Sequence, residues 1–148
     1  MFDLVLLKRW DKVLESDLDY ISLEIKKSTD SPAAIFLEGP LGAGKTTFTK
    51  HFIKSSGGET FSPTYSIINE VGPYVHADFY RLKDPEEIIH LELDYYLQDK
   101  DYVIIEWGKD YLSSVVRYLD ETYSIYQLEI QIDNNFRNFK LFKINLNR

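Results

Sequence analysis

Residues 39–46, which read GPLGAGKT, match the pattern G-x-x-x-x-G-K-[ST] and restrict the fold of this chain more than any other feature. Such a loop needs a strand before it and a helix after it, because its backbone N–H groups and the helix N-terminus must face the same anion. Residues 33–38 form a short apolar run, typical of a buried parallel strand. Residues 45–56 carry Phe48 and Phe52 at helical spacing. The sequence therefore predicts strand, phosphate loop and helix in succession, and binding of ATP or GTP.

The residue types of the loop fit triphosphate chemistry. Its glycines allow successive N–H groups to turn inward at φ values that a side chain would forbid. Lys45 would neutralise the β- and γ-phosphates, and Thr46 would place its hydroxyl on Mg²⁺. The N-terminus of the following helix adds about half a positive charge beneath the phosphates.

The rest of the chain alternates strand and helix patterns. We therefore expect an α/β protein of the P-loop NTPase type, with a mainly parallel sheet flanked by helices. Strands are expected at residues 2–7, 33–38, 65–71, 74–82, 102–105, 124–132 and 139–146. Helices are expected after a Ser16 cap, with Leu18, Ile21 and Ile25 as the apolar stripe, and at residues 45–56, 84–97 and 110–119.

The last two strands are expected to form an antiparallel hairpin at the edge of the sheet, joined by a turn at residues 133–135. No repeat or linker interrupts the pattern, so residues 1–148 are expected to be a single P-loop ATPase domain.

Composition restricts location and partners. The chain has no cysteine, which excludes disulfides and zinc–thiolate sites, and no apolar run approaches the length of a membrane-spanning helix. A cytoplasmic protein without membrane contact is expected. The net charge is −7, and basic residues are nowhere denser than Lys26-Lys27, so the chain lacks the charge pattern of an autonomous nucleic-acid binder.

Carboxylates for a metal site follow two of the expected strands. Glu106 ends the apolar run at residues 102–105, at the sheet edge where α/β proteins bind ligands, and is a candidate Mg²⁺ ligand. Asp78 lies in a polar row with His76 and Tyr80, and would hold Mg²⁺ through water or orient the attacking water. The histidines show no zinc-site spacing. Thr64 is a candidate nucleotide-sensing hydroxyl.

Four motifs, taken in order, resemble the TsaE (YjeE) family. They are GPLGAGKTTF at 39–48, SPTYSIINE at 62–70, HADFYRL at 76–82 followed by DPEE, and IIEWG at 104–108. Small departures from the family pattern, such as Pro40 and Gly108, remove no phosphate or metal ligand. The family consists of small bacterial P-loop ATPases. They are needed, with TsaB and TsaD, to make threonylcarbamoyladenosine (t6A) in tRNA at the adenosine beside the anticodon.

The resemblance implies a Mg²⁺-dependent ATPase that is slow alone and resets a complex with TsaB and TsaD, which would hold the tRNA. It implies that Asp78, Lys45 and Glu106 act in catalysis, and that Thr46, Glu106 and Asp78 form the metal site. The implied ATP contacts are Gly39, Leu41, Gly42, Ala43, Gly44, Lys45, Thr46, Thr47, Thr64 and Trp107.

Three other functions remain as alternatives. A GTPase-like switch would need an N-K-x-D or T-K-x-D element for guanine, and the chain has neither; residues 78–81 also lack the glycine of a D-x-x-G switch. A small-molecule P-loop kinase would need an arginine-rich lid, and the five arginines are scattered. A nucleotide-gated binding module would hydrolyse ATP slowly and act through complex assembly.

Overall fold

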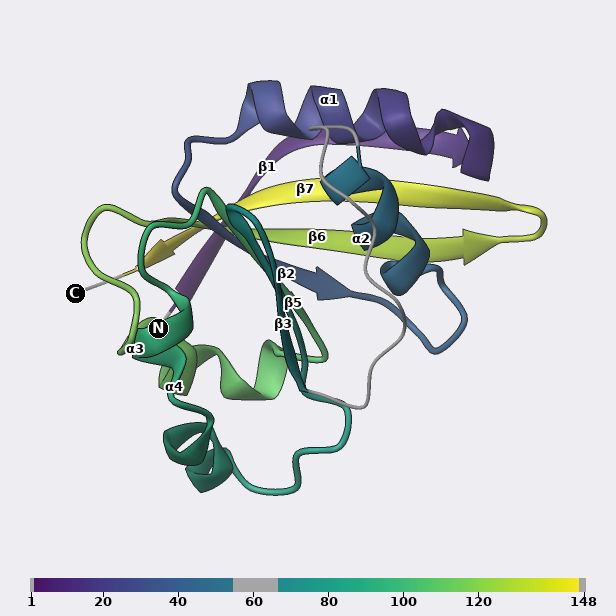
Figure 1. Ribbon diagram of the computed structural model, residues 1–148. Coiled ribbons are helices and arrows are strands. Elements are labelled where there is room, and N and C mark those ends of the chain that lie inside the picture. The colour runs from purple at the N-terminus through teal and green to yellow at the C-terminus, as the bar shows by residue number, and fades with distance from the viewer. Residues whose placement is uncertain (1, 55–66, 147–148) are drawn as a thin grey trace.

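The computed structural model describes residues 2–54 and 67–146. Within these residues, seven strands form one sheet in the order β1-β7-β6-β2-β5-β4-β3 (Figure 1). The strands are β1 (Phe2–Val13), β2 (Ala33–Glu38), β3 (Ile68–Val71), β4 (Tyr74–Asp78), β5 (Tyr102–Glu106), β6 (Ser124–Asp133) and β7 (Phe136–Leu146). The α-helices are α1 (Leu18–Ser28), α2 (Lys45–Lys54), α3 (Leu93–Tyr96) and α4 (Leu112–Val116), and the 3₁₀ helices are η1 (Glu15–Asp17), η2 (Pro85–Leu91) and η3 (Lys109–Tyr111).

The middle of the sheet is parallel. β6, β2, β5 and β4 run in the same direction, while β3 pairs antiparallel with β4 and β7 pairs antiparallel with β6. The expected α/β fold and the C-terminal antiparallel hairpin are therefore both present. The expected edge position is wrong, however, because β1 pairs antiparallel with β7 and forms that edge of the sheet, so the hairpin lies inside it.

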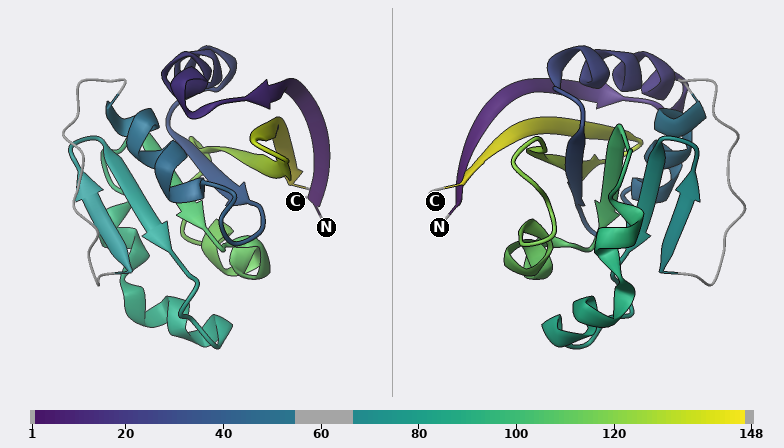
Figure 2. Two further views of the ribbon diagram at one scale, coloured as in Figure 1. Left: turned by 90° about the vertical axis from the view of Figure 1, so that its right-hand side faces the viewer. Right: turned by 60° about the vertical axis from the view of Figure 1, so that its left-hand side comes forward.

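Helices cover both faces of the sheet. α1 and α2 lie on one face, and α3 and α4 lie on the other (Figures 1 and 2). β2 is buried between these layers, and its first five residues are at most 1% exposed. Ile35 and Leu37 pack under α1 and α2, whereas Ala34 and Phe36 pack on the other face. The apolar run before the loop thus forms a strand buried on both sides, as its composition predicts.

The start of α1 differs from the sequence-based expectation. β1 continues to Val13 because β7 offers it a partner along that length. Ser16 does not cap the helix; the 3₁₀ turn η1 precedes α1, and the Asp17 carboxylate accepts a hydrogen bond from the Leu14 N–H at 2.9 Å. The predicted apolar stripe is nevertheless buried, at Leu18, Ile21 and Ile25.

The segment after β4 also differs. β4 ends at Asp78, not at residue 82, because Phe79 turns into the core and packs against Tyr111 with ring centroids 5.6 Å apart. The Leu82 N–H then donates to the Phe79 carbonyl at 3.0 Å and closes a turn. The helix expected at 84–97 is divided into η2 and α3 by Glu92, which has a left-handed backbone with φ of 55°.

Two further elements differ at their ends. The helix expected at residues 110–119 forms the short elements η3 and α4, and the last strand begins at Phe136. Of the strand expected at 65–71, residues 68–71 form β3.

Candidate functional site

The glycine-rich loop, residues 39–44, joins β2 to α2 at the carboxyl edge of the parallel strands. Gly42 and Gly44 have φ of +83° and +100°, in the region that side chains disfavour. Gly39 is needed for a different reason, because a Cβ there would lie 2.6 Å from the carbonyl oxygen of Ile130. The backbone therefore requires glycine at all three positions.

Arg137 holds the loop from the C-terminal hairpin. Its Nε donates to the Ala43 carbonyl at 3.0 Å, and Nη2 donates to the Gly42 carbonyl at 3.3 Å. These bonds connect β7 to the loop across more than ninety residues of sequence. No motif marks Arg137, so sequence reasoning missed it.

Lys45 begins α2 and is 6% exposed. Its Nζ donates to the Gly39 carbonyl at 2.6 Å and lies 3.6 Å from the centroid of the Trp107 ring. Trp107 has a left-handed backbone, with φ of 58°. Burial lowers the pKa of Lys45, and nearby carboxylates, chiefly that of Glu106, oppose this shift. The ammonium group is thus already positioned by a carbonyl and an aromatic face.

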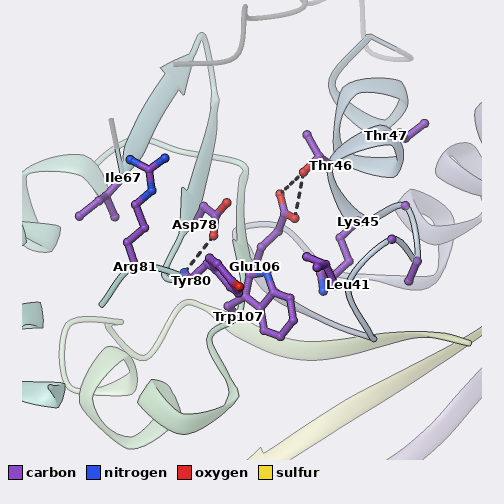
Figure 3. A pocket seen from close by; sticks show the side chains of 13 residues that line it. Leu41, Lys45, Thr46, Thr47, Ile67, Asp78, Tyr80, Arg81, Glu106 and Trp107 are labelled. Carbon is purple, nitrogen blue, oxygen red and sulfur yellow. Dashed lines mark hydrogen bonds between the residues drawn. The ribbon is translucent and has the colours of Figure 1, made fainter. Parts of the chain in front are cut away.

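Thr46 and Glu106 meet at the end of β5. The Thr46 hydroxyl lies 3.1 Å from each carboxylate oxygen of Glu106 (Figure 3). Glu106 is 2% exposed, and its Oε2 also forms a hydrogen bond with Nε2 of His76 on β4. Three elements therefore position this carboxylate.

Asp78 lies beside Glu106 because the two residues are register partners in the parallel pair β4–β5. Its Oδ1 accepts a hydrogen bond from the Tyr80 N–H at 3.0 Å. The Tyr80 ring lies 5.1 Å from that of Trp107, so the two aromatic side chains form one wall beside the carboxylates.

These groups surround a cavity of about 490 Å³ (Figure 3). It is lined by Leu41, Gly42, Ala43, Gly44, Lys45, Thr46, Thr47, Ile67, Asp78, Tyr80, Arg81, Glu106 and Trp107. Of the predicted site residues, only two are missing from this lining. Gly39 contacts Lys45 instead, and Thr64 lies outside the described residues. Sequence reasoning did not assign Ile67, Tyr80 or Arg81 to the site, although the last two lie within the motif that contains Asp78.

A second hollow, of about 280 Å³, lies against the loop and shares Gly42, Ala43, Gly44 and Thr47 with the first. Its other lining residues come from the segment before α1 and from the C-terminal hairpin. They are Val13, Leu14, Glu15, Leu18, Asn135, Arg137 and Phe139.

The oxygen atoms at the end of β5 fit a hard cation such as Mg²⁺. Thr46 supplies a hydroxyl, Glu106 a buried carboxylate, and Asp78 a second carboxylate at the adjacent register position. Within residues 2–54 and 67–146, no group of three or more His, Cys, Asp or Glu side chains could hold a metal by itself. The donor set therefore fits Mg²⁺ only if phosphate oxygens or waters complete the coordination.

A parallel sheet with this loop at its carboxyl edge, and a buried acid at the end of the neighbouring strand, defines an α/β protein of the phosphate-loop class. The sequence model of one family, "Threonylcarbamoyl adenosine biosynthesis protein TsaE", matches residues 14–139. The chain belongs to the TsaE family.

Individual relatives carry the name "tRNA threonylcarbamoyladenosine biosynthesis protein TsaE". The chain is 34% identical to that of Haemophilus influenzae over 96 residues, which cover 61% of each chain. It is 46% identical to that of Bacillus subtilis over 78 residues, 49% of this chain and 48% of the relative. It is 33% identical to the Nostoc protein over 124 residues, 72% and 75% of the two chains. The matches thus span about half to three quarters of these relatives.

A solved structure supports the fold. The crystal structure of Bacillus subtilis YdiB superposes with a TM-score of 0.66, covering 97% of this chain and 88% of YdiB at 24% sequence identity. Separately, the described residues contain no helix with the length and apolar character needed to cross a membrane.

Proposed function

We propose that this chain binds ATP with Mg²⁺ at the phosphate loop and hydrolyses it as a component of t6A biosynthesis. The observation that carries the proposal is the contact between the Thr46 hydroxyl and the Glu106 carboxylate, at 3.1 Å, beside the buried ammonium of Lys45. Binding of a metal–triphosphate complex requires a hydroxyl and a carboxylate near the metal and an ammonium near the phosphates, and this arrangement supplies all three.

Each side chain has a role in this proposal. The loop N–H groups and Lys45 bind and neutralise the phosphates. Thr46 and Glu106 would hold Mg²⁺, with Asp78 beside them, and the metal would neutralise charge on the phosphate oxygens. His76 orients the Glu106 carboxylate through its hydrogen bond. Asp78 orients the attacking water, since it lines the cavity at the carboxyl edge of β4.

The second hollow is suited to the nucleoside. It shares three loop residues and Thr47 with the phosphate cavity, so a nucleotide whose phosphates fill the first can place its base and ribose against the second. Leu14 offers exposed apolar surface there, and Asn135 offers an amide. Specificity for ATP over GTP would then be determined by groups outside the phosphate loop.

Membership of the TsaE family supports a biological role in t6A biosynthesis. The chain would act in the cytoplasm with TsaB and TsaD proteins, and its ATP hydrolysis would reset their complex between rounds of threonylcarbamoyl transfer. Its net charge of −7 supports an indirect relation to tRNA, which the partners would hold.

Calorimetric titration of the Lys45→Ala variant with Mg²⁺ and a non-hydrolysable ATP analogue tests the nucleotide site. We expect at least about a tenfold loss of affinity, because a buried phosphate loses a charge-assisted donor. Lys50→Ala is the matched control, since Lys50 lies on the same helix and does not line the cavity.

Equal affinities for the two variants would contradict the proposed site.

Release of phosphate from ATP without an acceptor separates an ATPase from a metabolite kinase. Competition by GTP against ATP separates an ATPase from a GTPase-like switch.

A further inference from the structure

Arg81 is a cationic side chain in the cavity to which sequence reasoning gave no role. It follows β4 by three residues and lines the cavity together with Asp78 and Tyr80. In Figure 3, the side chains of Asp78 and Glu106 lie between those of Arg81 and Lys45. Arg81 forms no hydrogen bond or ion pair with any residue of the two segments that the structure describes. Its five N–H donors are therefore not committed to those segments.

The charges around the cavity show what Arg81 can bind. Four charged side chains line the cavity, and the two cations, Lys45 and Arg81, balance the carboxylates of Asp78 and Glu106. A triphosphate brings more negative charge than one bound Mg²⁺ neutralises. Lys45 is the cation on the loop side, and Arg81 is the cation on the side of β4.

The position of Arg81 selects one phosphate. The loop binds the phosphates nearest the nucleoside, and Lys45 reaches toward the outer two. Arg81 follows β4 beyond the two acids proposed to hold the metal. With a triphosphate on the loop, the phosphate nearest to Arg81 would be the one farthest from the nucleoside. A guanidinium also matches the geometry of phosphate oxygens, because its N–H groups form a planar fork.

We propose that Arg81 binds the terminal phosphate of the nucleotide, so that the site distinguishes ATP from ADP. This inference rests on the proposed function, since it requires a triphosphate on the loop. It assigns the recognition of nucleotide state to a residue of the same chain, in a stretch that also supplies Asp78 and Tyr80. With ATP bound, the contact between Arg81 and the terminal phosphate would hold the residues after β4 against the phosphate loop. With ADP bound, this contact would be missing.

The test compares two ligands in four proteins. Wild type, Arg81→Ala, Arg81→Lys and Arg117→Ala are titrated by calorimetry with Mg²⁺ and either a non-hydrolysable ATP analogue or ADP. Arg117→Ala is the matched control, because it removes an exposed arginine at the end of α4 that does not line this cavity.

For Arg81→Ala we expect affinity for the ATP analogue to fall by about tenfold or more, while affinity for ADP stays within about twofold. Arg81→Lys should recover part of the loss, and Arg117→Ala should match wild type for both ligands. Equal losses for the two nucleotides, or no loss for either, would overturn the inference while leaving the proposed ATP site intact. Failure of wild type to bind either nucleotide would instead overturn the proposed function, and this inference with it.

Discussion

Glu106 has polar neighbours from two other elements. Thr46 comes from α2, His76 and Asp78 come from β4, and the carboxylate itself ends β5. Because Glu106 is only 2% exposed, these neighbours determine its orientation more than solvent does. A buried carboxylate held in this way can replace its hydrogen bond to a hydroxyl with a bond to a cation without a large rearrangement.

The Glu106→Gln substitution keeps the size of this side chain and removes its charge. We expect nucleotide binding to persist, because the loop and Lys45 are unchanged, and Mg²⁺-dependent phosphate release to fall by on the order of 100-fold. Steady-state phosphate release measured across a range of Mg²⁺ concentrations checks this. Glu121→Gln, an exposed acid outside the cavity, is the control. Turnover at the wild-type rate would contradict the proposed role of Glu106 as a metal ligand.

For individual residues, the sequence predicted which ones line the cavity where those residues lie in contiguous motifs. Lys45 and Thr46 are positioned by their own loop and helix, and Glu106 by the strand it ends, so local pattern was sufficient. Arg137 contacts the loop only because β7 folds beside it. Such a residue cannot be found from local sequence, because its role depends on the strand order of the whole sheet.

At the scale of elements, Lys26 joins α1 to α2. Its Nζ donates to the Phe52 carbonyl at 2.7 Å and lies 4.4 Å from the centroid of the Phe52 ring. The Tyr74 ring is a second aromatic face, 5.3 Å away. Burial between the helices lowers the pKa of Lys26 to about 8. The packing of the two helices is therefore linked to the protonation of one amine.

This linkage predicts a pH dependence of stability. Between about 8 and 10.5, the unfolded chain binds more protons at Lys26 than the folded chain, so this residue makes the free energy of unfolding rise with pH. We expect Lys26→Met to lose that contribution in urea unfolding measured across this pH range. Tyrosines with raised pKa values, such as Tyr123 at about 12, affect the pH dependence of stability equally in wild type and in Lys26→Met. The difference in free energy of unfolding between the two proteins therefore isolates the contribution of Lys26. Parallel stability curves would contradict the prediction.

Element types were predictable where burial is extreme. β2 and β5 are buried along most of their length and appear as apolar runs in the sequence. The ends of elements were less predictable. β4 stops where Phe79 turns to meet Tyr111, a partner more than thirty residues away, and Glu92 interrupts the next helix through its backbone conformation. Neither feature has a local sequence signal.

At the scale of the whole molecule, strand order was the least predictable feature. Sequence predicted the hairpin of β6 and β7, because its turn is local. It did not predict that β1, at the opposite end of the chain, pairs with β7 and becomes the edge. Charge, in contrast, is a property of the whole molecule that the sequence supplies directly.

The net charge of −7 leads us to expect no saturable binding of tRNA by the isolated chain at about 0.15 M salt. A filter-binding titration with labelled tRNA checks this, and a repeat at low salt serves as the control for weak electrostatic contact. Saturable binding that weakens steeply with added salt would show a basic surface that composition does not indicate.

The pairing of Asp78 with Glu106 across β4 and β5 has a mechanical consequence. Both acids are anchored by the backbone ladder of the sheet, and a slip of one residue would turn either side chain to the opposite face. This part of the proposed site is therefore rigid, so any movement that accompanies nucleotide binding and hydrolysis would come from residues outside the ladder. Tyr80 and Arg81, which follow the last residue of β4, are among those residues.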